Sequence, residues 1–567
     1  MNSDIPYRPG HRSPLRWLDL RRIPGGIRWR LNQLQTRRAR KSVEVLYRNT
    51  SQKAAPPGTP YVIADGMYDN PNHFFRMKLF LDALCGQTDM QRMGILRTSR
   101  ETDAKGTLES LGFNTFLNLE ETPHQLDTFR PQARALLAGV KSHADLLDLD
   151  LPEDIPAYVF YDTVLKVLRH PQPALDHPAW EYHLAELLRN MAIYADLFDR
   201  YDIRAVAFSH GWKNEYAAAV WTAIRRNVPA YHITAYYETL RIRRIADATD
   251  YACPKEGLSF ADFCAMPEET REAFIAKGWT NLNDRATGAT SDINGRSAYV
   301  SDSRPSDREA ARQALGIPTE ARVGLIYAHA WYDFPHIFGL GNFTDFRDWM
   351  TVTLEAIQQN RNVLWLLKPH PLESWYGTFR LADMATNMPD NIRILPEKTD
   401  SLTATRAADL GVTVHGTAGF EAAAHGIPVI SADKSYYSDW PFVHQARSRE
   451  HYLTLLSNAA DLRAPTPEVR AAAAAFAYLS GAPHPSDMGM LTLRCDSTGT
   501  PLYQDIVEHL KANSAACDRE TALISEWLAS GTDSYSVYGK IKHQNNLQAT
   551  ADGKLKNGAP AEQHTGY

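Results

Sequence analysis

The chain has 567 residues, of which 44% are hydrophobic and 22% are charged. A chain of this length exceeds one ordinary core, so we expect two or three soluble domains. Its 66 acidic residues outnumber its 61 basic residues and give a formal net charge of −5, which argues against a nucleic-acid-binding protein.

The five cysteines are scattered and contain no CxxC pair. This pattern argues against a zinc site and against a disulfide framework, and it fits a reducing compartment. No apolar run approaches the roughly 20 residues that span a bilayer. Arginines also interrupt the N-terminus where a signal peptide has its apolar core. We therefore expect a cytoplasmic enzyme.

Residues 1–57 form a basic N-terminal extension in which arginines are interleaved with tryptophan and leucine. A basic, partly amphipathic segment could lie on the anionic inner face of the cell membrane, with about 1 kcal/mol for each well-placed cation. The alternative is a poorly ordered leader with a solvated basic helix. The sequence is compatible with both.

A Pro/Gly-rich break at residues 55–60 precedes a predicted N-terminal α/β domain at residues 58–278. Short apolar runs alternate there with helical patterns, which is typical of a parallel sheet covered on both faces. We predict strands at 61–64, 92–96, 115–117, 205–208 and 230–233, and helices at 73–84, 125–199 and 216–226.

Residues 279–308 contain few apolar side chains and are predicted to be a linker. A second α/β series follows at residues 309–500, with strands predicted at 323–327, 363–367, 392–395, 411–414 and 428–431 and helices at 346–359 and 402–407. Helices at 501–538 could pack back across both domains, and the polar tail at 539–567 is predicted to be disordered. The predicted fold class is α/β, with two facing doubly wound Rossmann-like domains.

A stiff, basic turn follows the predicted strand 363–367. It reads Lys368-Pro369-His370-Pro371, and its two prolines hold His370 in an extended backbone. Ligands of open α/β sheets bind beyond the carboxyl ends of the strands, and lysine and histidine donors suit a phosphate. We predict a phosphate site at Lys368, His370 and Pro371. The alternative is a proline pair that only ends the strand.

A glycine turn and a helix follow the predicted strand 411–414. Gly416 lets the backbone approach a ligand, and Thr417 is a natural helix N-cap. Because free N–H groups at a helix start attract an anion, we predict ligand binding at Gly416, Thr417, Ala418 and Gly419. Glu421 lies one turn into this helix, where it could accept hydrogen bonds from ribose hydroxyls or only complement the helix dipole.

Polar and aromatic side chains also gather directly after the predicted strand 323–327. His329, Asp333 and His336 share one loop there. Metal binding is possible in principle, but no spacing in this loop is diagnostic of it. We predict a role at the cleft between the domains, with His329 as a ligand-binding residue and Asp333 as a catalytic acid or base.

Two loops of the first domain carry candidate general bases. Asp65 follows the predicted strand 61–64, and His210 follows the predicted strand 205–208. Each lies where an acceptor or a general base is needed. We therefore predict Asp65 and His210 as catalytic residues.

Together these motifs resemble those of the GT-B glycosyltransferases. The turn at 368–371 looks like the His-Pro motif of bacterial transferases that use CMP-activated sugars, including sialyltransferases and capsule Kdo-transferases. The run at 412–430 is similar to the capsule polysaccharide biosynthesis family, whose pattern it matches at Thr417, Glu421, Ala422, Gly426, Pro428 and Val429. It departs from that pattern at His415-Gly416, where Asn-Ser is expected. The resemblance covers residues 320–460, and it extends to the first domain only by architecture.

The resemblance implies a glycosyltransferase that moves a sugar from a nucleotide-activated donor, expected to be a CMP-sugar, to a glycan or lipid-linked glycan. His370 and Lys368 would hold the donor phosphate, the backbone near Thr417 would add N–H donors, and Glu421 would bind the ribose. No DxD-type motif stands at a strand end. We therefore expect metal-independent transfer without a further cofactor.

Other functions fit the same residues. A similar motif pair occurs in CDP-glycerol glycerophosphotransferases, so a polyol-phosphate transferase remains an alternative. A sugar-nucleotide epimerase on the same fold would need no acceptor. A non-catalytic scaffold that binds nucleotide sugars predicts binding that survives the loss of Asp65 and His210.

Overall fold

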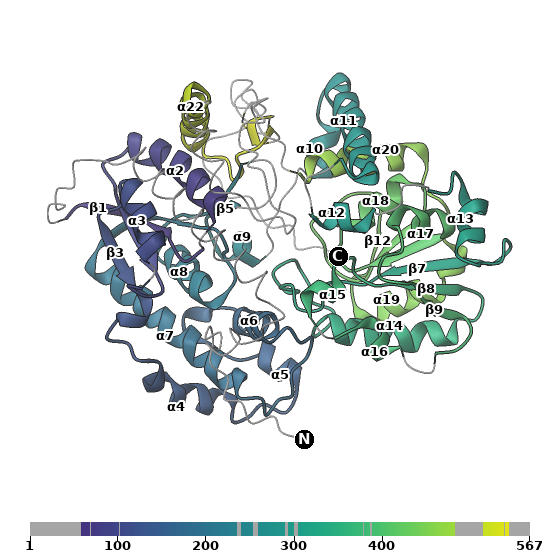
Figure 1. Cartoon of the computed structure of the whole chain (residues 1–567), viewed down its shortest axis with the longest axis horizontal. Helices are drawn as coiled ribbons and strands as arrows, with labels where there is room; N and C mark the ends of the chain where they lie inside the picture. The colour runs from purple at the N-terminus through teal and green to yellow at the C-terminus, as the bar shows by residue number, and fades with distance from the viewer. Residues whose placement is uncertain are drawn as a thin grey trace, which may run out of the picture.

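The computed structural model describes residues 58–68, 70–100, 102–234, 240–252, 259–289, 293–299, 304–377, 379–385, 388–481, 514–537, 539–541 and 543. The predicted N-terminal extension lies outside these residues, as do residues 501–513 and most of the predicted tail. No helix in the described part of the chain is long and apolar enough to cross a bilayer. Two α/β domains stand side by side in Figure 1.

The first domain is built on a six-stranded sheet with the order β3-β2-β1-β4-β5-β6. Its strands are β1 (Pro60–Asp65), β2 (Gln91–Leu96), β3 (Thr115–Asn118), β4 (Asp202–Phe208), β5 (Ala230–Thr234) and β6 (Arg241–Ile245). Neighbouring strands pair in parallel except β5 and β6, which are antiparallel. This strand order is that of a doubly wound Rossmann-like domain.

Two layers of helices cover the first sheet. They comprise α2 (Pro71–Gly86), α3 (Thr102–Ser110), α4 (Leu126–Leu137), α5 (His143–Leu147), α6 (Tyr158–Leu168), α7 (Ala179–Arg200), α8 (Asn214–Arg225) and α9 (Ala248–Ala252), with short 3-10 turns at Leu119–Glu121 and Pro152–Asp154. Ile63 of β1 packs into the core shared with α6, α7 and α8, whereas Val62 and Ala64 pack into the core shared with α2. The apolar run of β1 is therefore buried on both faces, as parallel strands require.

The second domain repeats this plan. Its sheet has the order β12-β11-β10-β7-β8-β9, and its strands are β7 (Val323–Tyr327), β8 (Leu364–Lys368), β9 (Ile392–Ile394), β10 (Leu410–Thr413), β11 (Val429–Ser431) and β12 (His444–Gln445). All five strand pairs are parallel. The predicted pair of doubly wound domains is confirmed.

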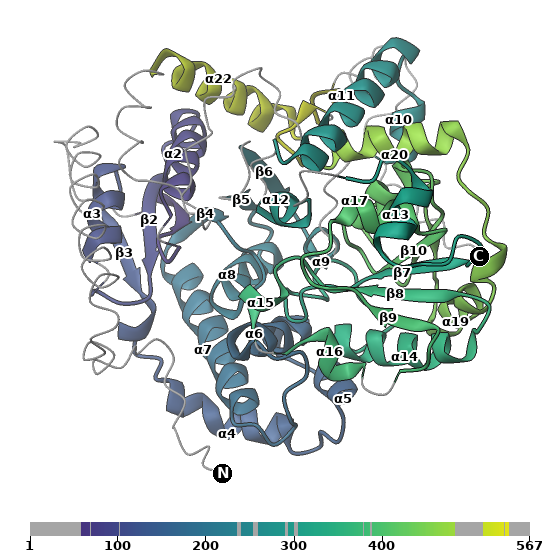
Figure 2. The same ribbon diagram turned by 45° about the vertical axis from the view of Figure 1, so that its right-hand side comes forward.

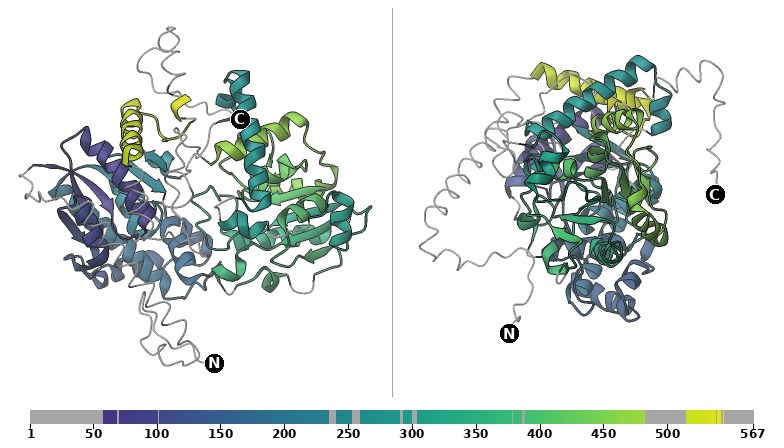
Figure 3. Two further views of the ribbon diagram at one scale, coloured as in Figure 1. Left: turned by 45° about the horizontal axis from the view of Figure 1, so that its top comes forward. Right: turned by 90° about the vertical axis from the view of Figure 1, so that its right-hand side faces the viewer.

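The helices of the second domain and the C-terminal helix are clearest in Figure 2. They comprise α13 (Arg308–Ala314), α14 (Phe346–Gln359), α15 (Glu373–Tyr376), α16 (Leu381–Met384), α17 (Ser401–Ala407), α18 (Ala418–Ala424), α19 (Arg449–Ser457), α20 (Pro467–Leu479) and α22 (Ser514–Ser530), with a 3-10 turn at Ala459–Asp461. Figure 3 shows α22 beside the first domain, where its Ile524 and Trp527 join the core that contains α2.

The predicted linker and the predicted domain boundary at residue 278 need correction. Helix α11 (Glu268–Thr287) runs through that boundary, and it is followed by α12 (Ile293–Ala298). Phe274, Leu282 and Ala286 of α11 are buried, and α11 packs along α20 (Figure 2). Only one narrow stripe of α11 is apolar, so its composition resembled that of a linker. Helix α10 (Phe260–Cys264) also packs on the second domain, through Trp440.

Other sequence predictions differ locally from the structure. The predicted helix 125–199 is divided among α4, α5, α6 and α7, because prolines and polar turns interrupt it. Strands β6 and β12 were not predicted. Strand β6 reads Arg-Ile-Arg-Arg-Ile, which lacks the continuous apolar run of a buried parallel strand.

Gly278 permits the close contact between α11 and α20. A Cβ atom at Gly278 would overlap the backbone carbonyl of Ala474, and a backbone cannot move aside as a flexible side chain can. We expect Gly278→Ala to lower the free energy of unfolding by about 3 kcal/mol, measured by urea denaturation. The control is Gly86→Ala, because a Cβ atom at the end of α2 would meet open space. Equal stability of the two variants would contradict this packing.

Candidate functional site

A cleft of about 480 Å³ opens at the carboxyl edge of the second sheet. It lies beyond β7, β8 and β10, at the point where the strand order reverses, which is where open α/β sheets bind ligands. The lining includes most of the predicted site residues: His329, Asp333, Lys368, His370, Pro371, Gly416, Thr417, Ala418 and Glu421. Of the other predicted residues, Asp65 and His210 lie in the first domain, and Gly419 packs elsewhere.

Lys368 is a buried cation at the end of β8. Its side chain is only 2% exposed, and its Nζ makes no hydrogen bond with any described residue. Burial lowers the pKa of Lys368 to about 8, and the nearby Asp400 and Glu397 only partly oppose this effect. An ammonium group held in this way favours an incoming anion.

The backbone fixes the tautomer of His370. The N–H of Leu372 donates to His370 Nδ1 at 3.2 Å, so in the neutral ring the proton is on Nε2. This bond follows from the turn at Pro369 and Pro371, which bring the chain back toward the ring. His370 therefore presents Nε2–H as a donor, and it lines the cleft together with Lys368.

Two further histidines line the cleft as neutral rings. His329 stacks on Phe346 with ring centroids 4.5 Å apart, and its Nε2 accepts the N–H of Val414 at 3.2 Å. Burial lowers the pKa of His329 well below its usual value and that of His415 to about 3. His415 Nδ1 is buried without a hydrogen-bond partner among the described residues. His415 was not predicted as a site residue.

The glycine turn after β10 is tightly packed. A Cβ atom at Gly416 would lie 3.0 Å from Thr413 Oγ1 and 3.4 Å from the His329 ring. Tyr437 donates its hydroxyl to the Gly416 carbonyl at 3.0 Å. The Tyr437 ring also occupies the space that a side chain at Gly419 would need. Gly419 therefore has a packing role, and it is absent from the cleft lining.

Thr417 does not cap the following helix with its side chain, contrary to the prediction. Its φ and ψ of −56° and −26° are already helical, and no side-chain cap bond forms. An N-cap side chain reaches the next amides from an extended backbone. Helix α18 has only 7 residues, so the exposed Thr417 contributes to the cleft as a polar wall residue.

Glu421 bonds to two residues that were not predicted. Arg285 Nε donates to Glu421 Oε1 at 3.0 Å, and the hydroxyl of Tyr299 donates to Oε2 at 2.6 Å. Arg285 belongs to α11 and Tyr299 follows α12, so both come from the predicted linker. No sequence pattern indicates them, because their position depends on how α11 packs on α20.

Asp333 lines the cleft and pairs with the first domain. Its Oδ1 lies 2.5 Å from Lys166 Nζ of α6. One and two turns earlier on α6, Asp162 and Tyr158 contact His336. The Asp162 and His336 side chains are 2.6 Å apart at Oδ1 and Nδ1, and the Tyr158 ring stacks on His336. This face of α6 joins the two domains beside the cleft.

Asp65 and His210 belong to one hydrogen-bonded chain in the first domain. Asp65 is completely buried, and its Oδ2 accepts the Ser209 hydroxyl at 2.5 Å. Ser209 Oγ lies 2.9 Å from His210 Nδ1. Because the hydroxyl proton goes to the carboxylate, His210 donates through Nδ1 and carries its lone pair on Nε2. Burial lowers the pKa of His210 to about 3, with His232 and His73 acting in the same direction.

The first-domain chain approaches the cleft through aromatic contacts. Trp212 packs against His232 with ring centroids 4.7 Å apart, and against Phe338 at 6.3 Å. Phe338 lines the cleft, and His232 Nε2 donates to the Ser209 carbonyl at 2.8 Å. Asp65 and His210 themselves are not part of the cleft lining.

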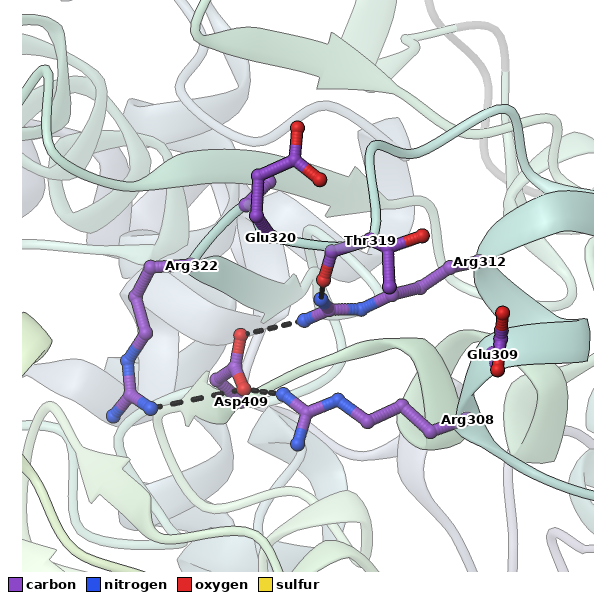
Figure 4. A pocket seen from close by; sticks show the side chains of 8 residues that line it. Arg308, Glu309, Arg312, Thr319, Glu320, Arg322 and Asp409 are labelled. Atoms are coloured by element: carbon purple, nitrogen blue, oxygen red, sulfur yellow. Dashed lines mark hydrogen bonds and ion pairs between the residues drawn. The ribbon is translucent and has the colours of Figure 1, made fainter.

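A smaller pocket of about 380 Å³ lies at the opposite, amino edge of the second sheet (Figure 4). Arg308, Arg312 and Arg322 converge there on Asp409, whose carboxylate also accepts the N–H of Val323 at 2.7 Å. Its lining contains three arginines and three acids. We interpret it as an ion cluster that ties α13 to β7 and β10.

No protein-family model matches the chain, and a search of curated proteins finds no match. Among solved structures, the chain is similar to the β-Kdo 2,4-transferase KpsC of Thermosulfurimonas dismutans, with 15% identity over 50% of this chain and 85% of that chain and a TM-score of 0.31. It is also similar to a UDP-GlcNAc 2-epimerase of Neisseria meningitidis, with 13% identity over 80% of this chain and 100% of that chain and a TM-score of 0.20. A glycosyltransferase of Rickettsia africae has 10% identity over 89% of this chain and 100% of that chain, with a TM-score of 0.23. The fold assignment rests on the strand order of the two sheets and not on these scores.

Proposed function

We propose that the protein is a glycosyltransferase that moves a sugar from a nucleotide-activated donor, a CMP-sugar, to a growing surface or capsular polysaccharide. The observation that carries this proposal is that the buried ammonium of Lys368 and the Nε2–H donor of His370 line one cleft, at the carboxyl edge of a doubly wound sheet. A nucleotide phosphate supplies the anion that this arrangement favours.

The reaction needs stabilisation of the departing nucleotide and activation of an acceptor hydroxyl. Lys368 and His370 would stabilise the phosphate, with the backbone at Gly416 and Ala418 and the Thr417 hydroxyl beside them. His210 would accept the acceptor proton at Nε2, and Asp65 would orient it through Ser209. The acceptor would be a glycan or a lipid-linked glycan, bound on the cytoplasmic side of the membrane.

The first test is a thermal-shift screen of CMP, CDP, UDP, GDP and ADP. A ligand that binds only the folded state stabilises it by about 2.7 kcal/mol at a hundredfold excess over Kd. We expect a cytidine nucleotide to raise the melting temperature of the wild type, and we expect His370→Ala to abolish this shift. His444→Ala, on the edge strand β12, is the control that should keep the shift.

The outcomes separate the candidate functions. A shift with UDP or GDP alone would retain a nucleotide site but contradict a CMP-sugar donor. No shift with any nucleotide would contradict the proposal. If a cytidine nucleotide binds, turnover of CDP-glycerol in place of a CMP-sugar would identify the polyol-phosphate transferase.

A second prediction separates an enzyme from a scaffold. His210→Ala is expected to lower the turnover of the bound donor by about 10²–10⁴-fold, the usual contribution of a general base. Donor affinity should stay unchanged, because His210 lies outside the cleft lining. Release of the nucleotide monophosphate measures turnover, and isothermal titration measures affinity. A wild type that binds the donor without turnover would favour the scaffold.

A further inference from the structure

The carboxylate of Glu421 is already engaged by the protein. Arg285 contacts Oε1 through two nitrogens, each at 3.0 Å, and Tyr299 donates to Oε2. All three residues line the cleft. The Arg285 side chain is only 15% exposed, so this is a nearly buried, charge-assisted pair. A ribose hydroxyl could reach Glu421 only in competition with these donors.

Arg285 is presented by a rigid helix. The buried residues Phe274, Gly278 and Leu282 are spaced four apart on the face of α11 that packs on α20. Asn281 and Arg285 are also four apart, on the neighbouring face, and both line the cleft. The glycine at position 278 lets α11 pack directly against the backbone of α20. The guanidinium is therefore fixed at the cleft by its helix and by Glu421.

Three cationic side chains line the cleft. Arg241, Arg285 and Lys368 reach it from three different elements, β6, α11 and β8. Two acids line the same cleft. One of them, Asp333, is paired with Lys166 of the first domain, and the other is Glu421.

We propose that Arg285 is a substrate-binding cation held in place by Glu421 and Tyr299, and that the donor carries a second negative charge in addition to its first phosphate. This inference rests on the proposed function. The planar guanidinium fork suits a second phosphate or a carboxylate equally. Glu421 is then a positioning residue that acts through Arg285, and the ribose is bound by other groups.

The test compares CMP, which has one acidic group, with two ligands that have a second one: the β-phosphate of CDP and the carboxylate of CMP-N-acetylneuraminate. Isothermal titration is done with CMP, CDP and CMP-N-acetylneuraminate on the wild type, and with UMP and UDP or GMP and GDP if those nucleotides bind instead. We expect at least tenfold tighter binding of a ligand with the second charge. Tighter binding of the diphosphate alone identifies a second phosphate, and tighter binding of CMP-N-acetylneuraminate alone identifies a carboxylate. Equal affinity of all three would overturn the inference.

Variants assign this preference to Arg285. Arg285→Gln should reduce the tenfold preference to about twofold or less and leave CMP binding nearly unchanged. Arg285→Lys should restore part of the preference. Lys277→Gln removes the same charge two turns earlier on α11, outside the cleft lining, and should have no effect. A preference retained in Arg285→Gln would overturn the inference.

A variant of Glu421 shows whether this residue positions Arg285 or binds the ribose directly. We expect Glu421→Gln to lose the preference as Arg285→Gln does, and the double variant to lose no more than either single variant. If Glu421 binds ribose directly, 2′-deoxy-CMP or 3′-deoxy-CMP binds the wild type more weakly than CMP, and Glu421→Gln removes only that difference. This result would overturn the inference while leaving the transferase intact. A wild type that binds no nucleotide would overturn both.

Discussion

Lys368→Met is expected to stabilise the free protein by about 3 kcal/mol at pH 7 and to abolish nucleotide binding. The pKa of Lys368 falls from its usual 10.5 to about 8 because its ammonium is buried, and a difference of this size corresponds to about 3 kcal/mol. Methionine fills a similar volume without a charge, so it removes the cost of burial together with the phosphate contact. Urea denaturation measures the gain in stability, and isothermal titration measures the loss of binding.

The pH dependence of this gain provides a further check. Between about pH 8 and pH 10.5 the unfolded chain binds the Lys368 proton more tightly than the folded chain does, so the stability of the wild type rises with pH in this window. The advantage of Lys368→Met should therefore be complete below pH 8 and should disappear as the pH approaches 10.5. Lys398→Met, at an exposed position, should change stability by less than about 0.5 kcal/mol. An unchanged or lower stability of Lys368→Met at pH 7 would contradict a costly buried ammonium.

His336→Ala is expected to lower the free energy of unfolding by about 3–5 kcal/mol, because it leaves the Asp162 carboxylate buried without its partner. Both side chains are less than one-tenth exposed, and they join α6 to the second domain. Burial alone would lower the pKa of His336, but Asp162, together with Asp345 and the Thr344 carbonyl, raises it above its usual value. Burial also raises the pKa of Asp162, so the pair retains a proton. His336 Nε2 donates to the Thr344 carbonyl at 3.0 Å, so the retained proton is shared between Nδ1 and Asp162 Oδ1, which are 2.6 Å apart.

Lys166→Ala provides a matched comparison on the same face of α6. The ion pair of Lys166 with Asp333 is 32% and 45% exposed at its two side chains, so its removal should cost no more than about 1 kcal/mol. Urea denaturation of the two variants measures the difference. A similar loss in both would mean that the buried pair contributes no more than a surface pair.

Most of the strands could be predicted from the sequence. The parallel strands of the two sheets include short apolar runs such as Val323–Tyr327, because a strand that is buried on both faces needs this composition. The antiparallel edge strand β6 was missed because it carries three arginines in five residues. Helix α11 was missed because only the stripe of Phe274, Gly278, Leu282 and Ala286 is buried.

The candidate site was predictable where it depends on local sequence. Lys368 ends β8, and His370 and Gly416 follow β8 and β10 within three residues. The carboxyl ends of parallel strands meet at one edge of a sheet. The tautomer of His370 follows from a bond to Leu372, only two residues away. These features require no information from distant parts of the chain.

The two Rossmann-like domains and the position of the cleft are predictable from the amino-acid sequence, because both depend on apolar strand runs and on the residues that follow them. Which groups meet in the cleft depends on the packing of distant elements. Arg285 and Tyr299 reach Glu421 across 136 and 122 residues, and Asp162 meets His336 across 174. Such contacts depend on how helices pack against each other, and packing is set by side chains that are far apart in the chain.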